Sequence, residues 1–226
     1  MMWFLNDGMT LERALIVIAS LLMTIFLILP IHEWAHGFVA YKLGDKTAKY
    51  SGRLTLNPLK HIDPLGAAAM ILFRFGWAKP VPVDARNFKR PKLGMALTAL
   101  AGPLSNLVVA LLAAICLIAI KYFNVSFVSQ NILKCILDFL SSFMSINIGL
   151  AVFNLLPLPP LDGSKILAAF FSDKILYSYY QYQRYVMLAV FFLLFTGVLS
   201  GPLVFLQVWV SRGIWWLAAQ PFVFFG

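Results

Sequence analysis

Apolar segments long enough to cross a bilayer recur along this chain of 226 residues, and they restrict its fold more than any other feature. About 20 residues of α-helix span the hydrocarbon core of a membrane. Hydrophobic residues make up 61% of the sequence and charged residues 12%, whereas soluble domains are about half apolar and a quarter charged. The sequence therefore predicts an all-α polytopic membrane protein with about four to six membrane helices, folded as a single domain over residues 1–226.

The predicted spans differ in length and regularity. The first runs from about Arg13 to Gly44, which is longer than a bilayer requires, and Pro30 predicts a bend within it. Further spans are predicted over about 93–120, 132–156 and 182–199. The final segment, 202–226, contains an arginine and three tryptophans, so it fits either a span or a helix at the membrane interface.

Two shorter segments follow the first span. "KYSGRLTLNP", residues 49–58, alternates with turn residues and predicts a short re-entrant β-hairpin. "PLGAAAMILFRFGWA", Pro64 to Ala78, is apolar but interrupted by Arg74 after about a dozen residues. It is too short to cross a bilayer, and we expect a re-entrant or surface-lying helix.

Positive charge is concentrated in the segments between the first two spans. The net charge is +9, and 11 of the 18 basic residues fall within residues 42–92. In a membrane protein this pattern indicates cytoplasmic loops rather than a nucleic-acid site. These residues are Lys42, Lys46, Lys49, Arg53, Lys60, Arg74, Lys79, Arg86, Lys89, Arg90 and Lys92.

"HEWAH" places two histidines and a glutamate inside the first apolar segment. On a helix, His32 and His36 share a face and can bind one metal ion, and Glu33 lies close enough to activate a water molecule. Each ionisable group in a membrane helix costs a few kcal/mol, which argues against a purely structural role for all three. The pattern predicts zinc-dependent hydrolysis, with Glu33 as the general base.

A catalytic zinc site needs a third protein ligand. Asp162 is favoured because it follows "NLLPLPPL", whose three prolines exclude regular helix and indicate backbone that lines a cavity or is buried in protein. His36 lies six residues before Lys42, or about 9 Å along a helix, and Asp162 follows a helix that ends on the same side. The other candidate ligands are His61, Asp63, Asp138, Asp173, Cys116 and Cys135.

Three motifs together resemble the site-2 protease family of intramembrane zinc metalloproteases. They are "HEWAH", "AGPLSN" at residues 101–106 and "NLLPLPPLDG" at residues 154–163, in the order that the family shows. "LNPLKHIDPLG" and "GWAKPVPV" are similar to linker segments of its small bacterial and archaeal members. Larger members carry a PDZ domain, but the segment between Ile120 and Ile132 is too short to hold one.

The resemblance implies a function and a role for each site residue. One zinc ion per chain would be bound by His32, His36 and Asp162, with Glu33 as catalytic base. The enzyme would hydrolyse peptide bonds in or near transmembrane segments of membrane proteins. Asn154 would bind the substrate backbone or the oxyanion. Alternatively, its side chain would hydrogen-bond the irregular backbone of this chain beside the prolines. Asn106 lies in the second motif. Close helix packing at Gly102 explains the presence of this motif equally well.

The resemblance and the distribution of positive charge together imply an organisation and a location. The catalytic core would cover about residues 13–171, and C-terminal helices would cover about 176–226. We expect an integral multi-pass protein of a prokaryotic cell membrane, with the active site toward the cytoplasmic side and no nucleic-acid partner. Its partners would be transmembrane protein substrates and the lipid bilayer, while the sequence predicts no oligomeric state.

Two further hypotheses concern substrate and function. An unfolded substrate could add as a strand to the open edge of the predicted hairpin at residues 50–57. The alternative to a protease is a zinc-binding membrane transporter or an inactive protease-like scaffold. Glu33 separates the two because hydrolysis needs a base beside the ligands and transport does not.

Overall fold

The computed structural model describes residues 10–73, 77–123 and 128–224 as an assembly of helices. Within these residues there is no strand, and the β-type pairing consists of an isolated bridge between Ile62 and Ala78. Three helices are both long enough and apolar enough to cross a membrane: Ala14–Lys42, Pro91–Tyr122 and Gln130–Asn154. The mostly helical membrane fold is therefore confirmed, whereas the predicted count of four to six spans is not.

The first spanning helix is built from three pieces. Helix α1 (Leu11–Met23) leads through a π-helical turn (Thr24–Ile28) into α2 (Leu29–Lys42). The turn lies directly before Pro30, where the predicted bend was expected. Proline has no N–H for the preceding turn of helix, and a wider turn accommodates the missing bond. The helix ends at Lys42, and Gly44 two residues later turns the chain with a φ of +113°, which favours glycine.

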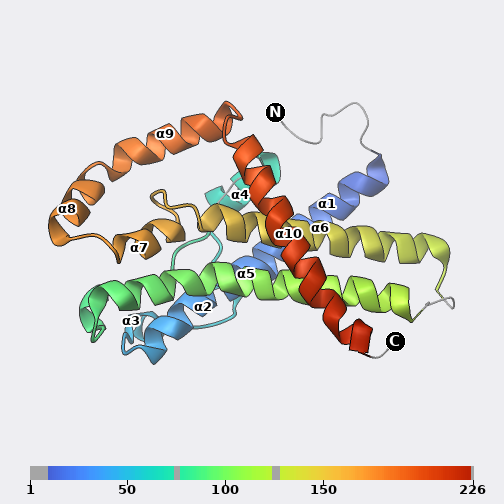
Figure 1. Ribbon diagram of the computed structural model, residues 1–226, viewed down its shortest axis with the longest axis horizontal. Helices are drawn as coiled ribbons and strands as arrows, with labels where there is room; N and C mark the ends of the chain where they lie inside the picture. Colours follow the sequence, from blue (N-terminus) through green and yellow to red (C-terminus); the bar gives the residue numbers. More distant parts are fainter. Residues whose placement is uncertain (1–9, 74–76, 124–127, 225–226) are drawn as a thin grey trace.

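Helices α5 (Pro91–Tyr122) and α6 (Gln130–Asn154) form the centre of the bundle. They run antiparallel and side by side, and α10 (Ser200–Phe224) crosses both of them (Figure 1). Small side chains on α5 let the neighbouring helices approach closely. The buried cluster between these helices includes Ile28, Ala110, Ala114, Leu117, Ile148 and Ala218.

The predicted hairpin at residues 49–58 is wrong. Helix α3 (Thr47–Tyr50) ends in a turn, and a 3-10 helix (Pro58–Lys60) follows. Local polar contacts favour these turns over paired strands. Asp45 accepts from the backbone N–H of Thr47, and the Asn57 side chain accepts from the N–H of Leu59. The strand edge that was expected to receive a substrate is therefore absent from these residues.

Helix α4 (Pro64–Phe73) has 10 residues and a length of about 15 Å, too short to cross a bilayer, as predicted. Its Met70 packs in a buried cluster with Leu21 and Ile25 of the first span. Ile25 lies about 25 Å along the helix from Lys42, so α4 reaches toward the middle of the bundle. This position favours the re-entrant interpretation over a surface-lying helix. Arg74, within the predicted segment, lies outside the described residues.

The chain after α6 forms four further helices: α7 (Asp162–Ala168), α8 (Asp173–Gln181), α9 (Gln183–Phe195) and α10. The predicted span over 182–199 is wrong, because α9 has 13 residues and a length of about 20 Å. It ends before Gly197, which has a φ of +77°. Helix α10 packs on the bundle through Ile214 and Ala218. It has 25 residues but is not among the helices that meet both criteria for a span.

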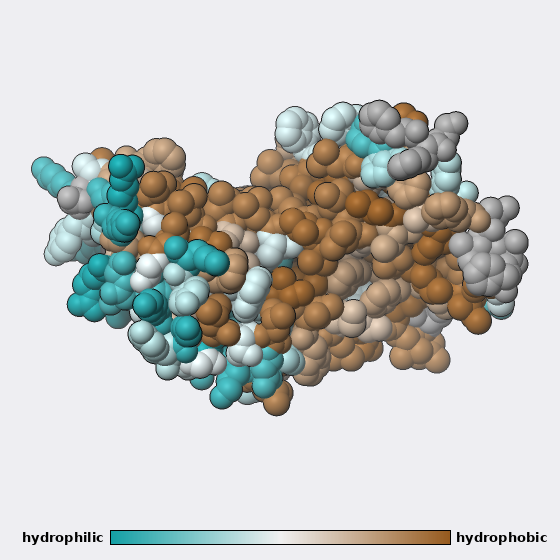
Figure 2. Space-filling view, turned by 90° about the horizontal axis from the view of Figure 1, so that it is seen from below, coloured by the Kyte–Doolittle hydropathy of each residue, from teal (hydrophilic) through white to brown (hydrophobic). Residues whose placement is uncertain are grey.

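Polar and apolar surfaces separate along the molecule. Figure 2 shows hydrophilic residues gathered mainly toward the end where α3 and the start of α5 lie, while hydrophobic residues cover most of the remaining face. The end of α2, with Lys42, and the start of α5, with Lys92, lie at this end. The protein is thus an apolar bundle with one basic end.

Candidate metal centre

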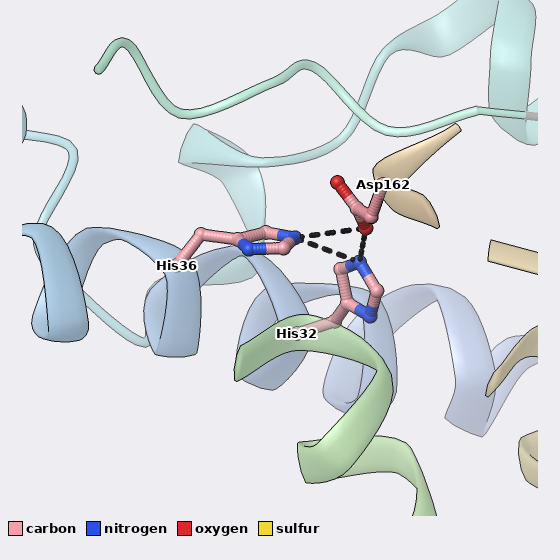
Figure 3. Close-up of side chains that lie close together, drawn as sticks. All are labelled: His32, His36 and Asp162. Atoms are coloured by element: carbon pink, nitrogen blue, oxygen red, sulfur yellow. Dashed lines mark hydrogen bonds and ion pairs between the residues drawn. The ribbon is translucent and has the colours of Figure 1, made fainter. Parts of the chain in front are cut away.

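Two helices bring three ligand-type side chains together (Figure 3). His32 and His36 project from the same face of α2, with their Nε2 atoms 3.0 Å apart. Asp162 is the first residue of α7, and its Oδ2 lies 3.3 Å from His32 Nε2 and 3.2 Å from His36 Nε2. All three side chains are buried. The predicted third ligand therefore lies within reach of the paired imidazoles.

Gly163 explains how Asp162 reaches this position. A Cβ atom at residue 163 would overlap the backbone carbonyl oxygens of Leu155 and Leu156. The absence of a side chain lets the start of α7 pack directly on the end of α6. The Ser164 hydroxyl donates to the carbonyl of Leu161 at 2.6 Å and closes the same turn. The carboxylate is thus fixed by tight backbone packing.

Helix α5 packs against the two imidazoles. The Nδ1–H of His36 donates to the backbone carbonyl of Thr98 at 2.6 Å, which orients the ring with its Nε2 toward His32 and Asp162, where it would bind a metal. A Cβ at Gly102 would lie 2.5 Å from His32 Nε2 and closer still to His36 Nε2. The α5 backbone can approach the pair because residue 102 has no side chain. Gly102 therefore shapes the centre as well as the helix packing.

The geometry fits a zinc ion. The ligand atoms of His32, His36 and Asp162 lie within 4.8 Å of one another. A tetrahedral zinc with bonds of about 2.0–2.1 Å holds its ligand atoms roughly 3.3 Å apart, close to the 3.0–3.3 Å separations found here. Two histidines and one carboxylate form a donor set typical of hydrolytic zinc sites, which keep a further position open. The residues present therefore fit zinc.

Asp162 is held in its charged form. Burial alone would raise the pKa of its carboxyl group, but hydrogen bonds with both imidazoles and the nearby positive charge of Lys165 lower it well below the usual range. The Nζ of Lys165 donates to Asp162 Oδ1 at 3.2 Å, while Oδ2 faces the imidazoles. The carboxylate thus has one oxygen for a metal and one for the lysine.

Glu33 lies beside this cluster in the same cavity. Its Oε2 accepts a hydrogen bond from the backbone N–H of Val81 at 2.8 Å. The cavity has a volume of about 710 Å³, within the usual range for ligand sites. Its walls combine the three ligands and Glu33 with apolar side chains that include Met70, Trp77, Val81, Leu150, Phe153 and Met187.

The remaining sequence candidates lie in different surroundings. Asn154 lines the cavity, and its Nδ2 donates to the carbonyl of Leu150 at 3.0 Å. Asn106 is buried on α5 but is not among the cavity-lining residues, and its amide has no hydrogen bond with any described residue. His61 is also buried, with its Nε2 paired to the carbonyl of Thr55 at 2.7 Å, and it is not part of the ligand cluster.

Several contributors to the centre were missed by the sequence reasoning. The Thr98 carbonyl and the Val81 N–H act through backbone atoms, which carry no side-chain signal. Lys165 was not singled out, although its spacing from Asp162 places both on one face of a helix. Val81 lies between two prolines in "KPVPV", and this position is the sequence feature that could have drawn attention to its backbone N–H.

Comparisons with known proteins agree with this geometry. The sequence profile of Peptidase family M50 matches residues 20–197. The chain is 45% identical over 148 residues to YwhC of Bacillus subtilis (strain 168), named as a candidate zinc metalloprotease, covering 65% of this chain and 67% of YwhC. It is 27% identical over 167 residues to the zinc metalloprotease MJ0392 of Methanocaldococcus jannaschii, covering 74% of this chain and 39% of MJ0392.

Rip2 of Mycolicibacterium smegmatis, also named as a candidate zinc metalloprotease, is 36% identical over 102 residues, which cover 43% of this chain and 38% of Rip2. No solved structure shows significant similarity to the chain. The family profile covers more than half of the sequence, including all three ligand residues and Glu33. The chain therefore belongs to peptidase family M50, the site-2 protease family of zinc metalloproteases.

Proposed function

We propose that this zinc metalloprotease cleaves peptide bonds in or near transmembrane segments of membrane-protein substrates, within the cell membrane of a prokaryote. One observation carries the proposal: the His32–His36–Asp162 cluster is buried in an apolar helical bundle and opens on an apolar cavity. A hydrolytic centre in these surroundings suits a substrate that is itself apolar.

Four side chains carry the proposed chemistry. His32, His36 and Asp162 hold one zinc ion, which supplies Lewis-acid activation of water and of the scissile carbonyl. Glu33 takes the proton of the attacking water and delivers it to the nitrogen of the leaving amine. The Thr98 carbonyl keeps the His36 ring oriented, since it accepts the Nδ1–H.

The cavity suggests how a substrate is held. The Nδ2 of Asn154 has two hydrogens and uses one of them for the Leu150 carbonyl. The other hydrogen is available for a substrate carbonyl or for the oxyanion. Peptide bonds in a helix are shielded by their own hydrogen bonds, so the substrate must unwind before it reaches Glu33. The apolar walls of the cavity can receive the side chains of an unwound membrane segment.

The depth of the cluster supports an active site toward the cytoplasmic side. His36 lies about 9 Å from Lys42 along α2, and Thr98 lies about 10 Å from the start of α5. Both measures refer to the end of the bundle where α2 finishes and α5 begins, and in the sequence 11 of the 18 basic residues fall within residues 42–92. Loops rich in lysine and arginine are retained on the cytoplasmic side of membranes.

The proposal is tested with purified protein in liposomes and a panel of single-pass substrates. The parent protein should contain about one zinc per chain and cleave at least one substrate. Glu33→Gln should keep zinc and lose cleavage, whereas Asp162→Ala should lose zinc as well. A zinc-loaded parent that cleaves no substrate but moves zinc across the liposome membrane would instead support the transporter alternative.

A further inference from the structure

A segment of chain without helix or strand lies directly against Glu33. Residues 79–83, "KPVPV", place Val81 between Pro80 and Pro82. Proline has no backbone N–H, so Val81 has the sole N–H group between Lys79 and Val83. That N–H donates to Glu33 Oε2 at 2.8 Å.

This segment is held in place by contacts at both ends. The guanidinium Nη2 of Arg53 donates to the carbonyl of Lys79 at 2.6 Å and to that of Pro80 at 3.2 Å. The N–H of Lys79 donates to the His61 carbonyl at 2.8 Å. Beyond the second proline, the N–H of Asp84 donates to Asp45 Oδ2 at 2.8 Å. The Val81 N–H thus belongs to a fixed segment of backbone.

The side chain of Val81 docks on the same helix face as Glu33. It is 8% exposed, and its Cγ1 lies 3.2 Å from the position that a Cβ would take at Gly37. Gly37 is four residues after Glu33, one turn along α2. A glycine at this position gives the valine room beside the base. The side chain of Val81 therefore packs at Gly37, while its backbone N–H binds Glu33 on the same turn of α2.

We propose that the Val81 N–H positions the general base, an inference that rests on the proposed role of Glu33. The N–H binds Oε2 and leaves Oε1 to receive the proton of the attacking water. A glutamate side chain has several rotatable bonds, and a hydrogen bond from fixed backbone restricts it to one orientation. The two prolines keep the segment extended and remove neighbouring donors that would compete for the carboxylate.

Two substitutions at residue 81 separate the backbone contribution from the side-chain contribution. Val81→Pro removes the N–H, and an extended residue before Pro82 already suits the proline backbone. Val81→Ala keeps the N–H and loses more side-chain packing. Measured on the same substrate, Val81→Pro should have a kcat about tenfold or more below that of Val81→Ala, with similar KM and unchanged zinc content.

A second measurement does not depend on activity. In protein labelled with 15N-valine, NMR follows hydrogen exchange at the Val81 amide, which is assigned by its loss in Val81→Ala. Exchange should be slow in the parent and in Glu33→Gln, since the glutamine oxygen still accepts. In Glu33→Ala, which has no acceptor, exchange should be about tenfold faster or more.

The two measurements distinguish failure of this inference from failure of the proposed function. A Val81→Pro variant as fast as Val81→Ala, or faster, would overturn the positioning role even when Glu33→Gln is inactive. Unchanged exchange in Glu33→Ala would refute the hydrogen bond itself. If the zinc-loaded parent cleaves no substrate, the proposed function fails, and the exchange result still decides whether Val81 holds Glu33.

Discussion

Adding one methyl group at residue 102 should remove zinc from the protein. In Gly102→Ala, the new Cβ would stand 2.5 Å from His32 Nε2 and closer to His36 Nε2. Ordinary contacts of this kind are about 3.5 Å, so the rings or the α5 backbone must shift by about 1 Å. Zinc–ligand distances tolerate about 0.2 Å. The required shift is therefore several times larger than the metal site can absorb.

The expected loss of zinc affinity is at least about 100-fold. Disturbing the groups that merely orient zinc ligands costs 10–100-fold, and Gly102→Ala displaces two ligands directly. The measurement is a competition titration of purified protein against a chelator of known affinity, together with elemental analysis of bound zinc. Proteolysis of the substrate panel should fall in parallel with zinc content.

Gly149→Ala is the matched control because residue 149 also lies in a spanning helix. Its Cβ would meet its nearest neighbour, Gln207 Nε2, at an ordinary distance of 3.5 Å. This variant should bind zinc as tightly as the parent. Full zinc occupancy with parental affinity in Gly102→Ala would refute the argument that the α5 backbone supports the ligand pair through the missing side chain.

Three further predictions concern the surroundings of the centre. Lys165→Met should weaken zinc binding about tenfold in the same titration, because Asp162 Oδ1 loses its partner, while Lys165→Arg should keep most of the affinity. Gly163→Ala should lower the free energy of unfolding by about 1–3 kcal/mol, measured by denaturation in mild detergent, because its Cβ overlaps two backbone carbonyls; parental stability would contradict the packing argument. Burial alone would raise the pKa of Asp45, but surrounding hydroxyl, amide and backbone donors lower it below 3.8. Its charged form therefore stabilises the fold above that pH, and the contribution is lost as the pH falls through the lowered pKa. The parent should lose thermal stability in this acid range more steeply than Asp45→Asn, and identical pH profiles would exclude the contribution.

Sequence reasoning succeeded where one physical requirement dominates. Long apolar segments predicted the helices that the structure places at Ala14–Lys42, Pro91–Tyr122 and Gln130–Asn154. The four-residue spacing of His32 and His36 fixed their common face. The prolines before Asp162 indicated irregular backbone at the C-terminal end of a span, and the structure brings that carboxylate to the histidines.

The failures arose where an alternating or apolar pattern was the whole signal, and side-chain contacts or a turn residue decided the structure. The alternating pattern at 49–58 suggested strands, but Arg53 donates to carbonyls beyond residue 78, and Asp45 binds the N–H of Asp84. Such partners cannot be read from a ten-residue pattern. The apolar segment at 182–199 was long enough for a span, yet its helix ends at Phe195, before Gly197.

The separation of the zinc ligands along the chain has a consequence for biosynthesis. His32 and His36 enter the membrane with the first helix, whereas Asp162 follows only after two more spanning helices have been made. Until then the histidine pair lacks its carboxylate, and Gly102 of the second span is also needed behind the rings. A ribosome-bound chain that ends before Asp162 cannot assemble the three-residue cluster, so any activity that depends on the cluster is confined to chains in which all three spanning helices have been made.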